Sequence, residues 1–501
     1  MKIFNALQLR EIDRRTIETE AISSWDLMER AASQVVDYLL NHYPSITTKP
    51  IHVICGKGNN GGDGLAIARL LQQKAAAVDV FLIEAVSYSA DNLLNQKLLP
   101  AVQLFNSSDC LDLKPEGYII DCLFGFGLNE ALSESWNMLI QQINDYSGTV
   151  ISIDLPSGLS ASMLIDVKSP IVKADETLTF QFPKETLLLP DYALFVGKWT
   201  ILDIQLNHSA IRETESDVYF IDKELVQRIL KPRSKFSHKG TFGHVAIVGG
   251  SLGKIGAVLM CTKAAIRTGC GLVTSFIPRC GYAIIQTAVP EAMVMLDESD
   301  ELVTNFTHLN EFQAIAVGVG LGVHKQTVDG FLNWLNTLTE KQQIVFDADA
   351  LNILAAHPEF LSLIPKGSIF SPHPKELKRL IGNWNSDAEK LKLAKEFAKQ
   401  HQITLIIKGA HTVILTSDGR TYYNSSGNSG MATGGTGDVL TGMLVSFRAQ
   451  GYASEESAVA AVYLHGLAGD YAAQQYGETS LIATDLIQHI SSAFLACSPT
   501  Q

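Results

Sequence analysis

The chain has 501 residues, which is too long for one ordinary hydrophobic core and predicts two or three domains. Hydrophobic residues make up 46% of the sequence and charged residues 18%, the usual balance of a globular enzyme. The net charge of −13 argues against nucleic acid and anionic membranes as partners, but not against phosphate-bearing small molecules, which helix N-termini bind through neutral backbone groups.

The N-terminal segment carries charges throughout and lacks a long apolar core, so we expect no signal peptide. No apolar run approaches the roughly 20 residues that cross a bilayer. The seven cysteines are scattered without a Cys-x-x-Cys pair, and the histidines lack the spacing of metal ligands. These features predict a cytoplasmic protein with reduced thiols and without a zinc site.

The first half alternates short apolar runs with helical patterns. Continuous apolar strands joined by helices indicate a parallel sheet covered on both faces, so we predict a Rossmann-like α/β/α sandwich over residues 1–210. Residues 56–64 are predicted as a turn and residues 65–76 as a helix. The predicted strands are 51–55, 78–83, 118–121, 150–154 and 177–182.

A polar segment without periodicity, residues 207–217, separates the two halves and is predicted as the linker. The second half repeats the alternation, which predicts another α/β domain over residues 218–501. Helices are expected over 257–267, after Asp438 and over 455–473. The predicted strands are 244–248, 272–277, 314–317, 344–346, 405–407 and 413–416.

Three motifs of the first half lie at the ends of predicted strands, the edge at which open α/β sheets bind ligands. GNNGGDG, which includes Asn60, opens a helix there, and Asp121 and Asp154 end two further strands. Oxygen atoms of Asn60, Asp121 and the region of Ser157 would together suit a hard monovalent cation. Asp154 would then be free for acid–base work, and residues 125–131 could form an anion-facing loop.

Each of these aspartates, taken singly, is also typical of a helix cap or a turn. Lys57 and Lys173 are typical of surface lysines and receive no role.

The longest motif is NSGMATGGTGDVLTGM, residues 428–443, in which glycines surround Asp438 ahead of a helical run. Glycine lets backbone N–H groups approach an anion closely, and the positive end of the helix points to the same place. Bound phosphate would repel a lone carboxylate, so its presence predicts a base that takes a proton from a hydroxyl attacking phosphorus. The alternative is a glycine-rich loop whose aspartate only complements the helix dipole.

Four other segments accompany this motif. GVGLG, residues 318–322, follows a strand, and Lys408 of KGAHT could reach a nucleotide phosphate. Asp347 and Asp349 could contact a magnesium–phosphate shell through water or cap the next helix, and capping is favoured for Asp349. His373 stands between two prolines that orient it, although a buried structural histidine is the alternative.

The second-half motifs together resemble the ribokinase-like superfamily of small-molecule kinases. In their order, GGSxGxxGA, GxGLG, DADALN, PHPxE, KGAxT and NxGMATGGTGDVLTG resemble the dehydratase domain of NAD(P)H-hydrate repair enzymes. GNNGGDG, DxLFGxGL and DLPSGL resemble the epimerase domain of the same enzymes. The resemblance covers nearly the whole chain and follows the order of the bifunctional bacterial members.

For the first domain, the resemblance implies interconversion of the R and S hydrates, with Asp154 as the candidate acid–base group. It also implies a potassium ion at Asn60, Asp121 and Ser157. The implied contacts to the hydrated dinucleotide are Asn59, Asn60, Gly61, Gly62, Asp63, Gly125, Phe126, Gly127, Leu128, Asn129, Glu130, Ala131 and Asp154.

For the second domain, the resemblance implies dehydration of the S hydrate at the expense of ADP with Mg²⁺, giving AMP and phosphate. Asp438 is the candidate base, and related domains form homo-oligomers, with a tetramer plausible. The implied hydrate contacts are Ala257, Gly322, His373 and Asp438; the implied nucleotide contacts are Lys408, Gly409, Ala410, His411, Thr412 and Gly437; and the implied anion hole is Gly435, Thr436 and Gly437.

Some residues depart from the family pattern: Val319 replaces a common proline, Lys375 replaces a common glycine, and the run FPKETLLL lacks a glycine after its lysine. None of these changes removes a candidate catalytic group. Two rival hypotheses remain open. One is a ribokinase-like kinase of a vitamin precursor fused to a dinucleotide-binding module, and the other is a first domain that only senses dinucleotides.

Overall fold

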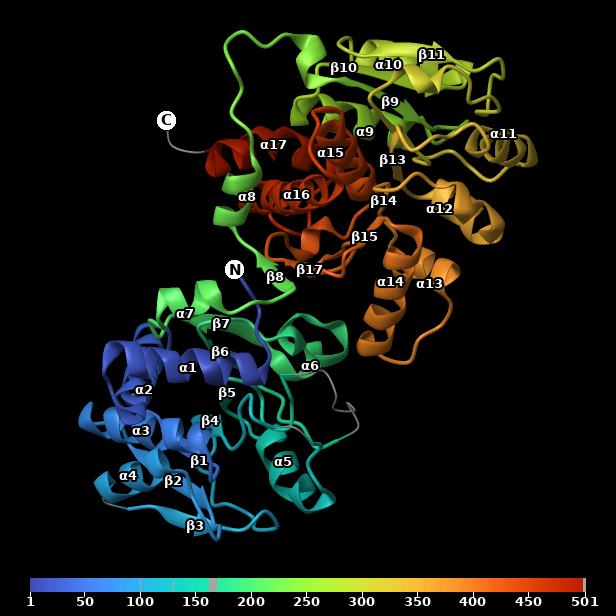
Figure 1. Ribbon diagram of the computed structural model, residues 1–501. Helices are drawn as coiled ribbons and strands as arrows, with labels where there is room; N and C mark the ends of the chain where they lie inside the picture. The colour runs from blue at the N-terminus through green and yellow to red at the C-terminus, as the bar shows by residue number, and fades with distance from the viewer. Residues whose placement is uncertain (100, 129, 162–168, 499–501) are drawn as a thin grey trace. The chain divides into compact units, whose positions relative to one another are not determined.

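The computed structural model describes residues 1–99, 101–128, 130–161 and 169–498 (Figure 1). The chain divides into two compact units, Lys2–Ser216 and Met1 with Asp217–Gln501. Within the described ranges, no helix combines the length and the apolar character that a membrane span requires.

The first unit is a parallel sheet with the strand order β3-β2-β1-β4-β5-β6-β7. Its strands are β1 (Ile51–Cys55), β2 (Val78–Ile83), β3 (Gln103–Phe105), β4 (Tyr118–Cys122), β5 (Thr149–Ile153), β6 (Glu176–Phe180) and β7 (Lys198–Leu202). Its helices are α1 (Ala6–Glu20), α2 (Ser24–His42), α3 (Asn59–Gln73), α4 (Ala90–Leu98), α5 (Asn137–Asn144), α6 (Ala193–Val196) and α7 (His208–Glu213).

Alternate side chains of the central strands enter separate cores on the two faces of this sheet. Val53 and Ile120 pack in a cluster with α2 and α3, whereas Ile54 and Ile119 pack with α5 (Figure 1). Helices on both faces leave the strands no solvated side, which explains their continuous apolar runs. The predicted Rossmann-like sandwich is confirmed.

The second unit is a larger sheet with the order β11-β10-β9-β12-β13-β14-β15-β16-β17-β8, antiparallel only at the two pairs that involve β16. Its strands are β8 (Val218–Ile221), β9 (His244–Val248), β10 (Leu272–Ile277), β11 (Met293–Leu296), β12 (Ala314–Val317), β13 (Gln343–Phe346), β14 (Ile369–Phe370), β15 (Thr404–Ile407), β16 (Val413–Leu415) and β17 (Thr421–Asn424). Its helices are α8 (Lys223–Ile229), α9 (Ile255–Thr268), α10 (Tyr282–Ala288), α11 (Lys325–Leu335), α12 (Asp349–Ala356), α13 (Pro374–Ile381), α14 (Asp387–His401), α15 (Thr436–Ala449), α16 (Ser454–Tyr476) and α17 (Ala483–Cys497).

One predicted loop is a helix. The segment predicted as a linker contains α7, because Asn207 caps a helical turn by accepting the N–H of Ala210 at 3.0 Å. Ala210 is buried in a cluster with Leu9 and Ile12 of α1. Tertiary packing against α1 therefore orders a segment whose own sequence shows no periodicity.

Candidate active sites

The candidate site of the first unit lies at the carboxyl ends of β1, β4, β5 and β6. After β1 the chain adds β2 and β3 on one side and then crosses back to place β4 on the other side. The gap between β1 and β4 is therefore the topological switch point at which open α/β sheets bind ligands.

Helix α3 begins at this point, inside the motif predicted as a turn through Gly64. Gly58 caps it without a side-chain hydrogen bond, so the first N–H groups lack a side-chain acceptor. A β-carbon on Gly61 would lie 1.8 Å from the carbonyl oxygen of Gly56, and one on Gly64 would lie 2.7 Å from Cβ of Cys122. The glycines thus permit close helix–strand packing, and the turn prediction is wrong from Asn59 onward.

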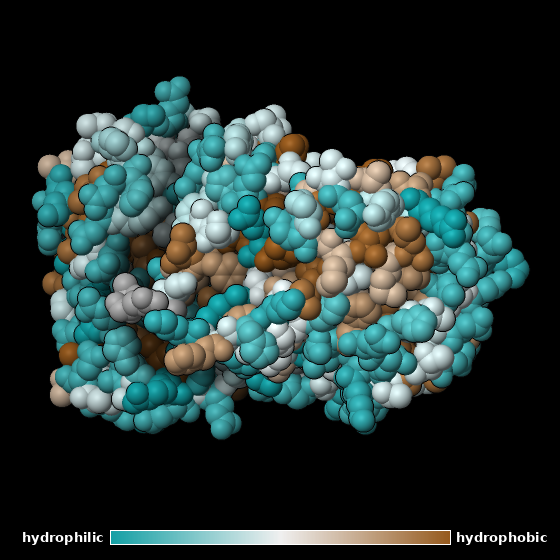
Figure 2. All heavy atoms as spheres, turned by 90° about the horizontal axis from the view of Figure 1, so that it is seen from above, coloured by the Kyte–Doolittle hydropathy of each residue, from teal (hydrophilic) through white to brown (hydrophobic). Residues whose placement is uncertain are grey.

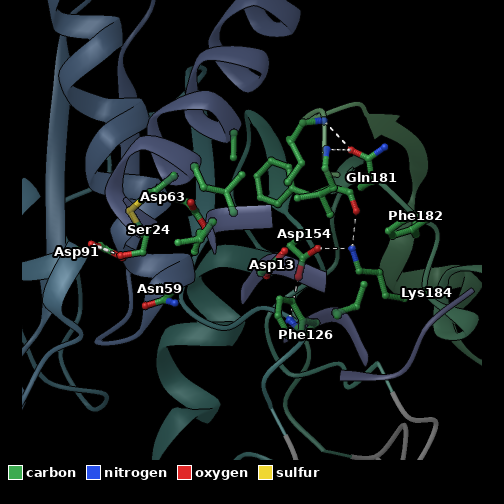
Figure 3. A pocket seen from close by; sticks show the side chains of 18 residues that line it. Asp13, Ser24, Asn59, Asp63, Asp91, Phe126, Asp154, Gln181, Phe182 and Lys184 are labelled. Carbon is green, nitrogen blue, oxygen red and sulfur yellow. Dashed lines mark hydrogen bonds and ion pairs between the residues drawn. The ribbon is translucent and has the colours of Figure 1, made fainter. Parts of the chain in front are cut away.

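Asp154 follows β5, and both of its carboxylate oxygens accept hydrogen bonds. Its φ of 69° lies in the left-handed region, where non-glycine residues are strained. Its Oδ2 accepts the N–H of Phe126 at 2.9 Å, and its Oδ1 accepts Lys184 Nζ at 2.5 Å. Lys184 is buried and also donates to Thr179 Oγ1 at 2.8 Å and to the Phe180 carbonyl at 3.1 Å, so its ammonium group is fixed beside Asp154 (Figure 3).

Lys184 was not predicted from the sequence to have a role. The available signal was a lysine that closely follows a predicted strand and stands just before the apolar run TLLL. A lysine that is buried together with this apolar run needs a charged partner, because an unpaired buried ammonium group lowers the stability of the fold.

Two adjoining cavities open onto Asp154. The larger has a volume of about 890 Å³ and the smaller about 170 Å³, and both are lined by Asp13, Asn59, Asp63 and Phe126. Of the predicted hydrate contacts, Gly61 and Gly62 lie buried in α3, Ala131 is exposed, and Asn129 lies outside the described residues. The predicted contacts that line the larger cavity are Asn59, Asn60, Asp63, Gly125, Phe126, Gly127, Leu128, Glu130 and Asp154.

The predicted cation ligands Asp121 and Ser157 are in direct contact. Asp121 accepts the Ser157 N–H at 2.9 Å and the Ser157 hydroxyl at 2.5 Å, and burial raises its pKa. Asn60 lies against Gly125, and neither its buried Nδ2 nor its Oδ1 has a hydrogen-bond partner in the described part of the chain. Amide, carboxylate and hydroxyl oxygens are the atoms that hard cations prefer, so the three residues fit an oxygen-ligated cation by chemistry.

Two further carboxyl groups, Asp13 of α1 and Asp63 of α3, face both cavities. Neither makes a hydrogen bond or ion pair with any residue that the structure describes. Burial raises the pKa of Asp13 to about 6, with Lys184 opposing and Asp154 adding to the rise. Burial likewise raises the pKa of Asp63 well above its usual range. Asp63 was predicted from the sequence as a site residue, whereas Asp13 was not.

The candidate site of the second unit joins two strand ends to the start of α15. Lys408, which follows β15, donates to Asp347 Oδ1 at 2.8 Å, and Thr441 of α15 donates to Asp347 Oδ2 at 2.6 Å. A β-carbon on Gly437 would lie 3.5 Å from Lys408 Nζ. The fold therefore brings together Lys408 and Gly437, which the sequence assigns to the nucleotide.

Asp438 lies in the first turn of α15. Gly435 starts this helix with a φ of 96° and no side-chain cap, so the N–H groups that follow lack a side-chain acceptor and form an anion-binding helix end. Burial raises the pKa of Asp438 to about 7, the charge of Asp347 adds to this rise, and Lys408 opposes it. A carboxyl group with this pKa is well matched to accept a proton near neutral pH.

The predicted capping role of Asp349 is wrong. Asp349 is the first residue of α12 and makes no cap; instead its Oδ2 accepts the N–H of Gly322 at 2.8 Å. Ala348 before it has a φ of 48°, which turns the chain so that the carboxylate faces the loop 318–322. Ala257, in the first turn of α9, lies against Gly320 of the same loop.

His373 is not the buried structural residue that was the alternative, because its side chain is 45% exposed. Its Nδ1 accepts the N–H groups of Lys375 at 3.1 Å and Glu376 at 3.4 Å, and it caps α13. In the loop 409–412, Thr412 Oγ1 donates to the Gly409 carbonyl at 3.1 Å. His411 Nδ1 lies 3.0 Å from the Asn424 carbonyl, while Gly409 and Ala410 are exposed.

Each unit thus carries acidic side chains at the carboxyl edge of a parallel sheet, and the second adds a glycine-rich helix start suited to phosphate. These features define a two-domain α/β enzyme that acts on small molecules. Residues 24–186 match the family described as YjeF-related protein N-terminus, and residues 245–492 match the family described as NAD(P)H-hydrate dehydratase.

A bifunctional NAD(P)H-hydrate repair enzyme of Moorella thermoacetica is 34% identical, covering 98% of this chain and 96% of that protein. The enzyme of the same name from Coxiella burnetii is 33% identical, covering 97% and 98%. The chain belongs to the family of bifunctional NAD(P)H-hydrate repair enzymes. A solved ribokinase-like superfamily protein of Enterococcus faecalis V583 is 28% identical with a TM-score of 0.52, covering 57% of this chain and 98% of that one, which confirms the ribokinase-like fold.

Proposed function

We propose that the protein repairs hydrated NADH and NADPH. The first unit interconverts the R and S hydrates, and the second unit dehydrates the S hydrate at the expense of ADP, giving AMP and phosphate. The observation that carries this proposal is Asp438, a carboxyl group whose pKa is raised to about 7 at a helix start built for an anion.

In the second unit, the ring hydroxyl attacks the terminal phosphorus of ADP. Asp438 takes the hydroxyl proton, and the N–H groups of Gly435 to Gly437 hold the developing charge. The bond to the bridging oxygen breaks and releases AMP. Phosphate is a far better leaving group than hydroxide, so loss of phosphate and a neighbouring ring proton restores the double bond.

Lys408 lies beside Gly437 and is partly exposed, so it can place a positive charge on a nucleotide phosphate. Magnesium accompanies the nucleotide as its phosphate complex. Asp347 and Asp349 are the carboxylates that would meet the water shell of this complex. Ala257, Gly322 and His373 would contact the dinucleotide.

In the first unit, we assign the hydrate to the larger cavity, between the start of α3 and the loop after β4. Asn60, Asp121 and Ser157 would hold potassium, which when bound supplies positive charge beside the buried carboxylate of Asp121. Replacing potassium with tetramethylammonium should slow epimerisation and leave dehydration of the purified S hydrate unchanged. Equal epimerisation in both salts would remove the cation from the proposal.

The direct test supplies mixed epimers of hydrated NADH, magnesium, potassium and ADP, and follows the near-ultraviolet absorbance of reduced nicotinamide. Complete recovery of both epimers is expected. Recovery that stops at the S fraction would overturn the epimerase assignment alone. Recovery with ATP but not ADP would change only the nucleotide, and accumulation of a phosphorylated product would favour the kinase alternative.

A homo-oligomer is also proposed, because apolar side chains crowd one edge of the second unit. Figure 2 looks down on the side that carries α10 and β11, and apolar atoms appear there among hydrophilic ones. β11 is an edge strand, and Tyr282, Ile284, Met293 and Leu296 are each more than 40% exposed. Light scattering of the full chain should give more than one copy, whereas a monomer would contradict this assignment.

A further inference from the structure

Asp13 occupies a position in α1 that packing alone would give to an apolar residue. Leu9, Asp13 and Ile17 follow one another at four-residue spacing, and all three line the smaller cavity. A carboxyl group placed between two apolar side chains and left without a partner destabilises the fold. Such a group marks a functional position more often than a structural one.

Asp154, by contrast, is held in place by the protein. Both of its oxygens already accept N–H groups, one from the ammonium of Lys184 and the other from the backbone of Phe126. These donors fix the orientation of the carboxylate. Asp13 and Asp63 have no such donors and face the same space from α1 and α3 (Figure 3).

We propose that Asp13 and Asp63 are the two proton-transfer groups of the epimerisation, and that Lys184 is a positioning residue that holds the carboxylate of Asp154 in place at the same cavities. This inference rests on the epimerase function proposed above. It assigns Asp13 a catalytic role and moves Asp154 from acid–base work to electrostatic stabilisation.

The reaction balances without any other reactant. The hydroxyl of the hydrate is on the ring carbon bonded to the ring nitrogen. One carboxyl group gives its proton to that oxygen, the carbon–oxygen bond breaks with its electron pair, and water leaves. The nitrogen lone pair forms a double bond to the carbon, which leaves a ring cation.

Water then adds to the opposite face of the ring. The second carboxyl group, as carboxylate, takes a proton from this water, and the electron pair returns to nitrogen. The water released equals the water consumed, and the two carboxyl groups exchange roles in the reverse direction. The charged Asp154 stabilises the ring cation, since a carboxylate near a developing positive charge lowers the barrier.

The test uses the full chain, purified R hydrate of NADH without ADP, and separation of the epimers by chromatography, with the rate in the absence of protein subtracted. Asp13→Asn should lower kcat for epimerisation by about 10²- to 10⁴-fold and leave KM near its original value. Asp13→Glu should recover part of the loss. Asp37→Asn is the matched control, because Asp37 is exposed on α2.

Two further readouts separate catalysis from structure. Water labelled with heavy oxygen should label the S product at the rate of epimerisation, because the carbon–oxygen bond breaks. Dehydration of the S hydrate with ADP should be unchanged in Asp13→Asn, and a retained cooperative unfolding transition of the first unit would show that the substituted unit is folded.

Epimerisation by Asp13→Asn within a few fold of the unsubstituted protein would overturn the inference, as would a change confined to KM or an unlabelled product. An unsubstituted protein that fails to epimerise the R hydrate would instead overturn the proposed function itself.

Discussion

The two candidate sites are built from the same parts in different arrangements. Each contains a lysine–aspartate pair, Lys184 with Asp154 in the first unit and Lys408 with Asp347 in the second. Beside each pair lies a carboxyl group with a raised pKa. In the second unit this group, Asp438, belongs to the longest motif, whereas in the first unit one motif aspartate, Asp154, is paired and another, Asp63, is not paired with any described residue. A motif therefore identifies a site but does not identify which of its carboxyl groups moves a proton.

The lysines differ as well. The side chain of Lys184 is 2% exposed, whereas that of Lys408 is 22% exposed. The three N–H groups of Lys184 donate to protein oxygens, so this lysine cannot bind a ligand. Lys408 can still bind a phosphate. A lysine–aspartate pair therefore has a structural role in the first unit, whereas in the second unit the lysine of the pair is available to bind a ligand.

The largest effect is expected from Asp438→Asn. Loss of the base should lower kcat for dehydration of the S hydrate by roughly 10³-fold, with ADP binding by calorimetry retained. Asp329→Asn is a suitable control, because Asp329 is exposed on α11. Turnover near that of the unsubstituted protein would remove Asp438 as the base.

Lys184→Met sharpens the contrast between the two lysines. It leaves Asp154 buried without its charged partner, so the free energy of unfolding of the first unit should fall by about 3–5 kcal/mol in a denaturant titration. Lys408→Met should lower the free energy of unfolding of the second unit by a smaller amount, because Lys408 is partly exposed. The control Lys325→Met breaks an exposed pair and should change stability by less than about 1 kcal/mol. Equal losses for Lys184→Met and Lys325→Met would contradict this account.

The pH dependence of dehydration is the third test. Asp438 must be a carboxylate to take the proton, so kcat should fall about tenfold per pH unit below about pH 7 and level off above it. Burial is the main cause of this raised pKa, and the charges of Asp347, Lys408 and Asp349 modify it. A profile that stays flat from pH 8 to pH 6 would show that another group takes the proton.

The smallest effect is expected for Asp13→Asn, on thermal stability. Asp13 has a folded-state pKa of about 6 against an ordinary value of 3.8, so between these values the folded state binds more protons than the unfolded state. Stability is therefore lost as the pH rises through this window. Asp13→Asn removes the unpaired charge and should raise Tm at pH 8 by about 2–4 °C, with little gain at pH 4. A lower Tm at pH 8 would indicate a structural role for Asp13.

Local sequence signals predicted several strands correctly. The strands 51–55, 244–248 and 314–317 have the predicted bounds, because each is a short continuous apolar run next to glycine or polar residues. The turn predicted from Asn59 onward was wrong. Glycine residues taken in isolation indicate a turn, but here they allow the segment to form a helix that packs closely against β1 and β4.

The candidate site follows the same rule. Asp121, Asp154 and Asp438 stand in motifs next to strands or helix starts and were selected from the sequence. Asp13 and Lys184 were not selected, because their roles depend on how α1 and the segment after β6 fold over the strand ends. The periodicity of α1 predicts an amphipathic helix but not the surface against which it packs.

Helix α7 determines where the first unit can be separated from the rest of the chain. The segment 207–216 holds α1 in place: Lys2 donates to the carbonyls of Arg212 and Thr214, and Gln8 donates to that of Glu215. A fragment restricted to the matched residues 24–186 would omit α1 and Asp13 altogether, and one ending before α7 would leave α1 untethered. Chimeras that exchange the first unit between relatives should therefore be joined after Ser216. The exchanged part then contains both α1, which carries Asp13, and the segment 207–216 that holds α1 in place.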